Sequence, residues 1–304
     1  MLTFFTTAKP FRGHDSIIQR NALHSWKLLH PDVEVILFGD EEGAARVCGE
    51  FGLHHEPHVE RHEHRIPYVN FMFGRAQEIA RHDFLCYSNC DIVFLKDFWK
   101  AFRKAAAWRR RFLLVGRRWD TDVTEPIDFG RKDWTTELRQ LALTTGFHQI
   151  PYYVDFFLFS KGLYDEVPPL IVGRAYWDHW VVWKALSAGA PVLDCSPFVV
   201  PVHQNHGYGL QPERTKGSAT DALSVRNREL SGDGRHLRSI LDATHELTRY
   251  GNIRRALFRR QLAKSSVQTL WQGFLKNTFW LRRRLGLRRQ NLDKLMGYDP
   301  ERMD

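Results

Sequence analysis

Residues 86–94 read CYSNCDIVF, an apolar segment that polar side chains interrupt before apolar residues resume. The apolar residues 84–88 predict a strand that is buried in a sheet. Asn89 and Asp91 follow where this strand ends, and they lie on the same side of an extended chain. One interpretation is a simple turn, which these residue types favour. The other is a ligand site, in which Asp91 is the first ligand of a divalent cation and Asn89 contacts a ribose or a metal-bound water.

Strands and helices alternate outward from this segment. We predict strands at residues 2–7, 33–39, 84–88, 112–116, 153–160 and 191–195. We predict helices at residues 16–29, 42–51, 69–81, 97–110 and 135–144, and a further helix that starts near Trp177. This alternation predicts an α/β fold with a mixed, largely parallel sheet that helices flank. Ligands bind beyond the carboxyl ends of the strands in such sheets. The polar residues at these ends are Thr6, Thr7, Asp40, Asn89 and Asp91.

The composition is that of a globular protein. Of the 304 residues, 43% are hydrophobic and 26% are charged, which excludes an intrinsically disordered chain. No run reaches the roughly 18 apolar residues that a membrane-spanning helix needs. The N-terminal residues lack the basic and apolar regions of a secretory signal, so we expect none. The four cysteines form no CxxC pair, and we therefore expect buried thiols in a reducing compartment and a cytoplasmic protein.

The excess positive charge lies at the end of the chain. Residues 251–304 hold 13 of the 44 Lys and Arg but only 4 of the 35 Asp and Glu, so the first 250 residues carry 31 of each sign. We therefore divide the chain into a domain at residues 1–250 and a basic tail at residues 251–304. Apolar residues recur every three or four positions from 253 to 285, which predicts a basic amphipathic helix or helix pair. Such a segment either binds an anionic membrane surface or packs against the domain or a second subunit.

An ordered series of segments resembles a known enzyme family. The segments are TTAKPF (6–11), SIIQRNALHSW (16–26), EVILFGDEEG (34–43), YSNCDIVF (87–94), LLVGRRWD (113–120), AYWDHWVVWKA (175–185) and HQNHGYG (203–209). Together they are similar to the bacterial and plant nucleotide-diphospho-sugar transferases with the GT-A fold, and the resemblance spans residues 2–245. It implies a Rossmann-like GT-A domain at residues 1–250. It also implies a glycosyltransferase that moves a sugar from a nucleotide-diphospho-sugar donor to a hydroxyl of a saccharide or lipid-linked acceptor, with Mn²⁺ or Mg²⁺ as cofactor.

The resemblance assigns the metal motif of the family to Asn89, Cys90 and Asp91. An amide replaces the first acid of that motif here, so Asp91 is its one acidic metal ligand. His203 and His206 both match the late histidine that many GT-A enzymes use to bind the metal or the diphosphate. A neutral imidazole suits a metal ion and a protonated one suits phosphate. We assign His203 to the metal and His206 to the donor.

The donor-binding residues form a larger set. They are Thr6, Thr7, Lys9, Asp40, Arg65, Asn89, Asp91 and His206, with Arg117 and Arg118 as further candidates. The resemblance implies that Thr6, Thr7 and Asp40 line the pocket for the nucleotide base. Asp40 could equally be the N-cap of the helix that follows it. Arg65 could contact the sugar or the diphosphate, because arginine pairs well with phosphate.

Asp178 and Asp155 are the candidate catalytic residues. Asp178 lies in WDHW at the start of a helix, where a partly desolvated carboxylate could take a proton from an acceptor hydroxyl. The resemblance implies that role in an inverting reaction, and the alternative is a helix cap. Asp155 directly precedes the apolar segment FFLFS, and it either orients the acceptor or satisfies backbone donors.

Other function classes receive less support. The histidines at positions 54, 55, 58, 62 and 64 match no standard zinc pattern, and we interpret them as a polar loop. A sugar-phosphate nucleotidyltransferase would carry a Gly-rich phosphate loop with a lysine after the first strand, to which TTAKPFRG is only faintly similar. A nucleic-acid-binding protein acting through its tail is the other alternative, but we expect no nucleic-acid partner because the first 250 residues are neutral. A membrane-bound tail would suit a lipid-linked acceptor in surface-polysaccharide synthesis, with the protein on the inner face of the cytoplasmic membrane.

Overall fold

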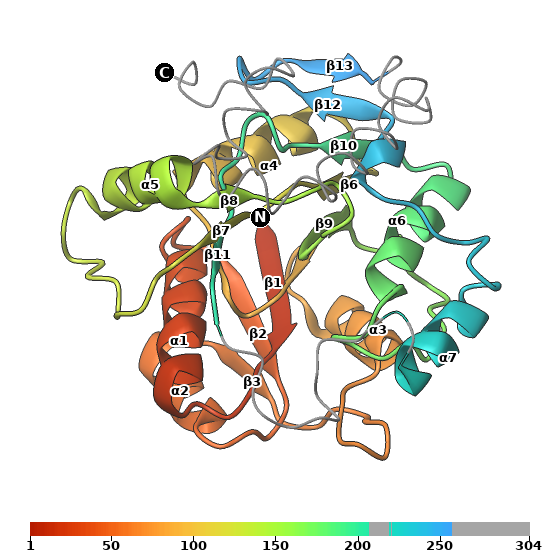
Figure 1. The fold of residues 1–304 in the computed structure, drawn as a ribbon, viewed down its shortest axis with the longest axis horizontal. Helices are drawn as coiled ribbons and strands as arrows, with labels where there is room; N and C mark the ends of the chain where they lie inside the picture. Colours follow the sequence, from red (N-terminus) through yellow and green to blue (C-terminus); the bar gives the residue numbers. More distant parts are fainter. Residues whose placement is uncertain (207–218, 220, 257–304) are drawn as a thin grey trace, which may run out of the picture.

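The computed structural model describes residues 1–206, 219 and 221–256. Its strands form a central layer with helices on either side (Figure 1). The larger sheet has nine strands in this part of the chain, in the order β13–β12–β10–β6–β9–β4–β1–β2–β3. Their bounds are β1 Leu2–Thr7, β2 Glu34–Phe38, β3 His54–Glu56, β4 Phe84–Ser88, β6 Leu113–Val115, β9 Phe156–Ser160, β10 Val192–Asp194, β12 His245–Leu247 and β13 Ile253–Arg255.

The strand directions confirm the predicted mixed, largely parallel sheet. β1 runs parallel to both β2 and β4, with Thr7 beside Phe38 and Phe5 beside Tyr87. β9 runs antiparallel to β4 and β6, and β13 runs antiparallel to β12. The carboxyl ends of β1, β2 and β4 therefore meet at one edge of the sheet, where ligands bind in α/β proteins.

The helices cover the sheet on two faces. They are α1 Gly13–Lys27, α2 Ala44–Phe51, α3 Val69–Ile79, α4 Lys96–Trp108, α5 Trp134–Thr145, α6 Trp177–Ser187 and α7 Ala222–Leu230, with a short 3-10 helix at Ile240–Asp242. One core contains residues of α1, α2 and α4, and the other contains residues of α3 and α6. Each face of the sheet thus has its own apolar layer.

The side chains of β1 alternate between these two cores. Phe4 stacks on Trp26 of α1 with ring centroids 5.0 Å apart, and Phe5 meets Phe73 of α3 edge-on at 5.1 Å. All four rings are fully buried. Burial on both faces explains the uninterrupted apolar sequence of β1, and each such ring contributes roughly 1.5–3 kcal/mol.

A smaller sheet stands beside the carboxyl edge of β4. Its strands in the described part of the chain follow the order β5–β11–β7–β8, with bounds β5 Ile92–Val93, β7 Trp119–Thr121, β8 Phe147–His148 and β11 Val202–Gln204. In β11, His203 faces Ile92 of β5 on one side and Asp120 of β7 on the other. This sheet brings position 203 next to position 91.

Some predicted elements have different ends. The first helix begins at Gly13 rather than residue 16, and β9 begins at Phe156 rather than residue 153. β3 includes His54 and His55, so the first two members of the histidine cluster lie in an edge strand and not in a loop.

The beginning of the predicted tail belongs to the sheet. Ile253–Arg255 form β13, which pairs with β12, so no helix begins at residue 253 and the sheet extends past the boundary that we placed at residue 250. The rest of the predicted tail, residues 257–304, lies outside the described residues. Within residues 1–206, 219 and 221–256, the helices are too short or too polar to cross a lipid bilayer.

Candidate functional site

A cavity of about 860 Å³ opens beyond the carboxyl ends of β1, β2 and β4. This volume lies in the range of small-molecule and cofactor sites. Ten of the residues singled out from the sequence line it: Thr7, Lys9, Asp40, Arg65, Asn89, Asp91, Arg118, Asp155, His203 and His206. They come from seven separate segments of the chain, which the fold gathers at one edge of the sheet.

Three of the predicted residues lie outside the lining of this cavity. Thr6 is fully buried, and its hydroxyl donates to the carbonyl oxygen of Thr7 at 3.1 Å. Successive side chains of a strand point to opposite faces, so Thr7 faces the cavity and Thr6 cannot line a base pocket there. Arg117 donates through Nε to the carbonyl oxygen of Gln149. Asp178 is the third residue outside the lining.

Asp91, His203 and His206 form a compact cluster. The Nε2 atom of His206 lies 3.1 Å from Asp91 Oδ2, and the Nε2 atom of His203 lies 3.5 Å from the same oxygen. One ligand atom from each residue lies within 4.8 Å of the others. The predicted pair of Asp91 and His203 is therefore a group of three, to which His206 belongs directly.

The charges of this cluster are strongly coupled. Burial alone would raise the pKa of Asp91, but the charge of His203 and hydrogen bonds from both histidines hold that pKa well below its ordinary value. Burial would lower the pKa of His203, yet the charge of Asp91 and a hydrogen bond to Asp120 raise it to about 9. The two histidines thus keep Asp91 ionised, as a carboxylate ligand of a metal ion must be.

The cluster has the chemistry of a divalent-cation site. Asp91 Oδ1 is buried, and no group in the described part of the chain forms a hydrogen bond with it. A buried carboxylate oxygen that lacks a protein partner is costly unless a ligand satisfies it. Carboxylate and imidazole are both common ligands of divalent metals, so the three side chains fit such an ion.

A second carboxylate, that of Asp155, also lines the cavity. Its Oδ1 atom accepts from Asn89 Nδ2 at 2.7 Å and lies 2.6 Å from Arg118 Nη1. Its Oδ2 atom is buried without a hydrogen-bond partner among the described residues. Asn89 therefore anchors Asp155 here. One carboxylate oxygen is fixed while the other remains available to a ligand.

The end of β2 carries a group of charges that the sequence indicated only in part. Asp40 Oδ1 lies 3.0 Å from Arg61 Nη2, and Glu41 Oε1 lies 2.5 Å from Arg61 Nη1. Asp40 does not cap the next helix, because the N-cap of α2 is Gly43 in a left-handed conformation with φ of 87°. The alternative role of Asp40 as a cap is therefore wrong.

The first strand ends at polar groups that face the same cavity. Lys9 Nζ lies 2.9 Å from Asp15, and the backbone N–H of Lys9 donates to Gln19 Oε1 at 2.6 Å. The hydroxyl of Thr7 is buried and finds no hydrogen-bond partner in the part of the chain that the structure describes. These groups leave one hydroxyl and one ammonium facing the space beside Asp40.

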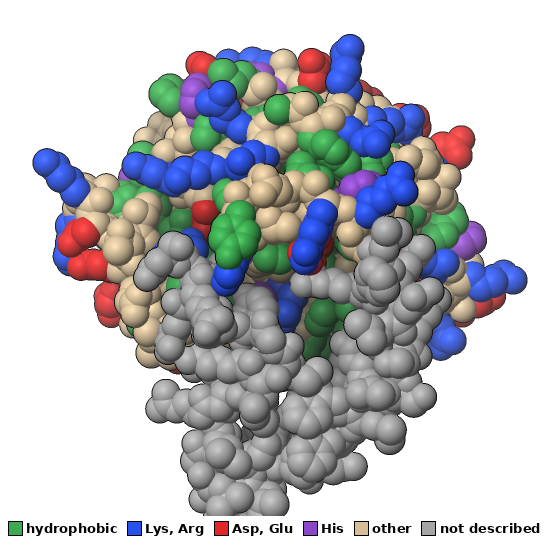
Figure 2. Space-filling view, turned by 90° about the horizontal axis from the view of Figure 1, so that it is seen from above, with side chains coloured by type: hydrophobic (Ala, Val, Ile, Leu, Met, Phe, Trp, Pro, Cys, Tyr) green, Lys and Arg blue, Asp and Glu red, His purple; other side chains and the backbone are tan. Residues whose placement is uncertain are grey.

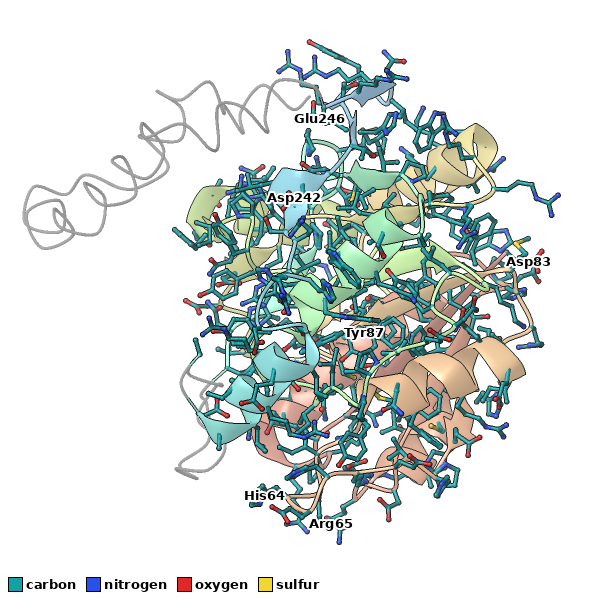
Figure 3. The ribbon with its side chains drawn as sticks, turned by 90° about the vertical axis from the view of Figure 1, so that its right-hand side faces the viewer. His64, Arg65, Asp83, Tyr87, Asp242 and Glu246 are labelled. Carbon is teal, nitrogen blue, oxygen red and sulfur yellow. The ribbon has the colours of Figure 1, made fainter. Side chains whose placement is uncertain are left out.

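Arg65 reaches the cavity from an outer loop. In Figure 3, Arg65 and His64 lie together at the outer end of the loop between β3 and α3, whereas Tyr87 lies inside the molecule. Arg65 has φ of 60°, a conformation that side chains rarely adopt, and it is exposed. His62, Glu63 and His64 could also hold a metal ion by their spacing, but two of the three are exposed.

Asp178 lies in the first turn of α6, whose N-cap is Tyr176. Burial raises the pKa of the Asp178 carboxyl, and the charge of Asp155 adds to the increase. The carboxyl is therefore near enough to the site to respond to Asp155, although it does not line the cavity.

The sequence did not single out several lining or supporting residues. These are Asp15, Gln19, Glu41, Arg61, Arg174, Asp120 and Gln149. Asp120 was visible as the last residue of LLVGRRWD, and it is the middle residue of the short strand β7. Arg61 lies in the histidine-rich segment, where its partners Asp40 and Glu41 are 20 or more positions away.

Comparisons with known proteins were made on sequence and on structure. A scan against protein-family models gave no match, and a search of curated proteins gave none. Among solved structures, S. aureus TarS 1-349 in complex with UDP-GlcNAc is similar with a TM-score of 0.50 and 11% identity, over 80% of this chain and 67% of that chain. Glucosyl-3-phosphoglycerate synthase from Mycobacterium tuberculosis, in complex with Mn²⁺, UDP and glucosyl-3-phosphoglycerate, matches with a TM-score of 0.41 and 12% identity, over 68% of this chain and 73% of that chain. The similarity to TarS is a similarity of fold, and it confirms the architecture that the sequence predicted. The chain has the GT-A glycosyltransferase fold.

Proposed function

We propose that this protein is a glycosyltransferase that moves a sugar from a nucleotide-diphospho-sugar donor to a hydroxyl group of a saccharide or lipid-linked acceptor, with Mn²⁺ or Mg²⁺ as cofactor. The observation that carries the proposal is the Oδ1 atom of Asp91, which has no hydrogen-bond partner among the described residues and lies in the cavity at the end of β4, on a carboxylate that contacts two histidines. TarS, which shares the fold, was crystallised with UDP-GlcNAc, a donor of this class.

Residues at the ends of β1 and β2 are the proposed donor contacts. Thr7, whose hydroxyl has no hydrogen-bond partner within residues 1–206, 219 and 221–256, and Asp40 both line the cavity, and both can form hydrogen bonds with a ribose or a base. Lys9 and Arg65 bring positive charge to the same space, which suits a diphosphate. Their positions around one cavity would fix the donor in a single orientation, which supplies much of the rate advantage of a two-substrate reaction.

Asp91, His203 and His206 would hold the cation. When bound, the cation would neutralise the negative charge that builds up on the departing diphosphate. The protein side chains keep this group of ligands in place before the donor binds. The backbone carbonyl of Asp91 accepts from the Nε2 atom of Gln204 at 3.1 Å and from the backbone N–H of Gln204 at 3.1 Å.

Asp155 and Asp178 remain the two candidates for the group that takes the proton of the acceptor hydroxyl. Asp155 lines the cavity and has one available oxygen, which favours a direct contact with the acceptor. Burial raises the pKa of Asp178, which is the direction that makes a carboxylate a better general base, but Asp178 lies outside the cavity lining. We propose that Asp155 orients the acceptor and that Asp178 acts in an inverting reaction. The anomeric configuration of the product, measured by NMR, tests the inversion.

The test of the proposed function is a binding screen followed by a transfer assay. UDP, GDP and ADP are titrated by calorimetry with and without Mn²⁺, and the matching sugar nucleotides are then incubated with mixed acceptors. Binding that Mn²⁺ strengthens, followed by release of the nucleoside diphosphate, supports a glycosyltransferase. Release of pyrophosphate from a nucleoside triphosphate and a sugar phosphate would support a nucleotidyltransferase instead.

The described surface offers one feature that favours contact with an anionic membrane. Residues 96–111 hold seven Lys and Arg, and the single acid among them, Asp97, is paired with Arg139. Burial lowers the pKa of His245, and the charges of Arg109 and Arg255 lower it further. The end of α4 and β13 therefore bring positive charge to the same place. β12 and β13 lie at the top of Figure 1, and Figure 2 looks down from that side on Lys and Arg side chains spread over the visible face.

Vesicle flotation tests this surface. Full-length protein and a truncation after Ala256, which keeps β13, are mixed with vesicles that contain or lack anionic lipid. Flotation of both proteins with anionic vesicles would place membrane binding on the folded domain. Flotation of the full-length protein alone would place it on residues 257–304, and flotation of neither would exclude the peripheral role in surface-polysaccharide synthesis that we propose.

A further inference from the structure

We infer that Asp120 is a positioning residue for the cation site, which orients the ring of His203 so that its Nε2 atom faces Asp91. The inference rests on the proposed function, because it assigns a role within the proposed cation site. Asp120 was not among the residues that the sequence singled out for chemistry.

The two residues are neighbours because of the small sheet. β7 and β11 run parallel, and their register places Asp120 directly beside His203. The Oδ1 atom of Asp120 lies 3.1 Å from His203 Nδ1, on the side of the ring away from Asp91. The ring is therefore held between two carboxylates, one at each nitrogen.

Asp120 is itself held in place from two other directions. Arg118 Nε donates to its Oδ1 atom at 2.8 Å, and Gln149 Nε2 donates to its Oδ2 atom. Arg118 is deeply buried and also pairs with Asp155, so it cannot turn away without leaving a charge unpaired. Both oxygens of Asp120 have protein partners, and the residue does not line the cavity. Asp120 can therefore act on a bound ion only through His203.

This arrangement has a clear consequence for a metal ligand. A carboxylate in ion-pair contact with one imidazole nitrogen favours the proton on that nitrogen, which leaves the other nitrogen free to bind a metal and restricts rotation of the ring. With Nδ1 turned to Asp120, the Nε2 atom of His203 is directed to the space that it shares with Asp91 and His206. Without Asp120 the ring could rotate or present the wrong tautomer.

The experiment measures Mn²⁺ binding without turnover. Full-length wild type, Asp120→Asn, Asp120→Ala and the control Asp133→Asn are titrated with Mn²⁺ alone, and free Mn²⁺ is read by electron paramagnetic resonance. Asp133 is the matched control because it also pairs with an arginine, Arg131, but at an exposed position. We expect Asp120→Ala to weaken Mn²⁺ binding about 10- to 100-fold, Asp120→Asn to weaken it less, and Asp133→Asn to leave it unchanged.

A second titration separates positioning from a general structural role. UDP and GDP are titrated in the absence of metal, and binding to the Asp120 variants should equal that of wild type. If a variant loses metal-free nucleotide affinity and Mn²⁺ affinity to the same extent, the inference is overturned. If Asp120→Ala does not fold, the same comparison is made with Asp120→Asn. If the wild type binds Mn²⁺ and an Asp120 variant binds it equally well, the role of Asp120 is rejected while the proposed function stands. Wild-type protein that binds no Mn²⁺ would reject both this inference and the metal-dependent function.

Discussion

The Nε2 atom of His206 lies 3.1 Å from the carboxylate of Asp91, although 115 positions separate the two residues in the chain. The contact exists because β5 and β11 pair in the small sheet directly after the central strand β4 ends. It places two imidazoles against one carboxylate whose second oxygen has no hydrogen-bond partner in the described part of the chain. The predictions below concern this cluster and the buried contacts that hold it.

Replacing Asp91 by Asn should abolish the proposed function and keep the fold. The amide has the same shape but lacks the charge that attracts a cation and that raises the pKa of His203. We expect transfer activity to fall by at least about 100-fold, in the range seen when one charge-stabilising group of an active site is removed. Activity assays and circular dichroism of the same preparation check both parts, and full activity in Asp91→Asn would disprove the assignment.

The pair of Arg118 and Asp155 should be important for stability. Both side chains are buried, and removing one partner of such a pair leaves an uncompensated charge in the interior. We expect Asp155→Ala to lower the free energy of unfolding by about 3 kcal/mol, near the lower limit for buried pairs because Asp120 still pairs with Arg118. Urea denaturation measures the change. The exposed pair of Arg131 and Asp133 supplies the control, and Asp133→Ala should change the free energy of unfolding only slightly.

Glu34 should make the stability depend on pH in the acid range. Burial would raise the pKa of its carboxyl, but hydrogen bonds from Thr3 and Arg81 outweigh burial and lower the pKa below its ordinary value of 4.5. A lowered folded pKa means that the charged form stabilises the fold. This contribution is complete above the ordinary pKa and disappears as the pH falls through the folded pKa.

Substitution of Glu34 isolates that effect. We expect Glu34→Gln to lower the free energy of unfolding by about 1–2 kcal/mol at pH 7, because hydrogen bonds to a charged group are lost. At pH 3, below the ordinary pKa of 4.5, the difference from wild type should be smaller, since the carboxyl of the unfolded wild type then binds a proton and part of the stabilisation is lost. Denaturant titrations at the two pH values measure it, and a difference that grows toward low pH would contradict the reasoning.

Gln204 should support the cation site from behind. Its buried amide donates to the carbonyl oxygens of Ile18 and Asp91 and accepts from Asn21 Nδ2 at 2.9 Å. Removing it leaves these groups without their partner, which costs about 1–3 kcal/mol. We expect Gln204→Ala to lower stability by this amount and to weaken Mn²⁺ binding as well. Calorimetry with Mn²⁺ and urea denaturation give the two readouts, and loss of stability with unchanged Mn²⁺ affinity would limit Gln204 to a structural role.

Much of the fold followed from local patterns in the sequence. The continuous apolar residues of β1, β2 and β4 predicted strands buried on both faces, and the structure places all three in the interior of the larger sheet, with neighbours on both sides. The direction of β9 was not predicted, because an apolar strand that is buried on both faces has the same sequence pattern in either direction. β13 was missed for a different reason. Its three residues, one Ile and two Arg, also fit a basic amphipathic helix over so short a stretch.

The candidate site could be predicted only where residues stand at the ends of strands. Asp91 was found in that way, because a polar residue after a buried strand stands out from its neighbours. The prediction for Thr6 is wrong because successive side chains of a strand point to opposite faces. Thr7 lines the cavity, so the side chain of Thr6 points away from it. Asp120 and Arg61 act through partners that lie far away in the sequence, so no local pattern marks them.

The most direct test of the central claim is the affinity of one nucleoside diphosphate with and without Mn²⁺, measured by calorimetry for wild type and Asp91→Asn. The account predicts that Mn²⁺ tightens binding of UDP or another nucleoside diphosphate to the wild type at least about 10-fold, since neutralised phosphate charge favours binding. Mn²⁺ should leave the nucleotide affinity of Asp91→Asn unchanged. Equal enhancement by Mn²⁺ in both proteins, or no nucleotide binding to the wild type under either condition, would contradict it.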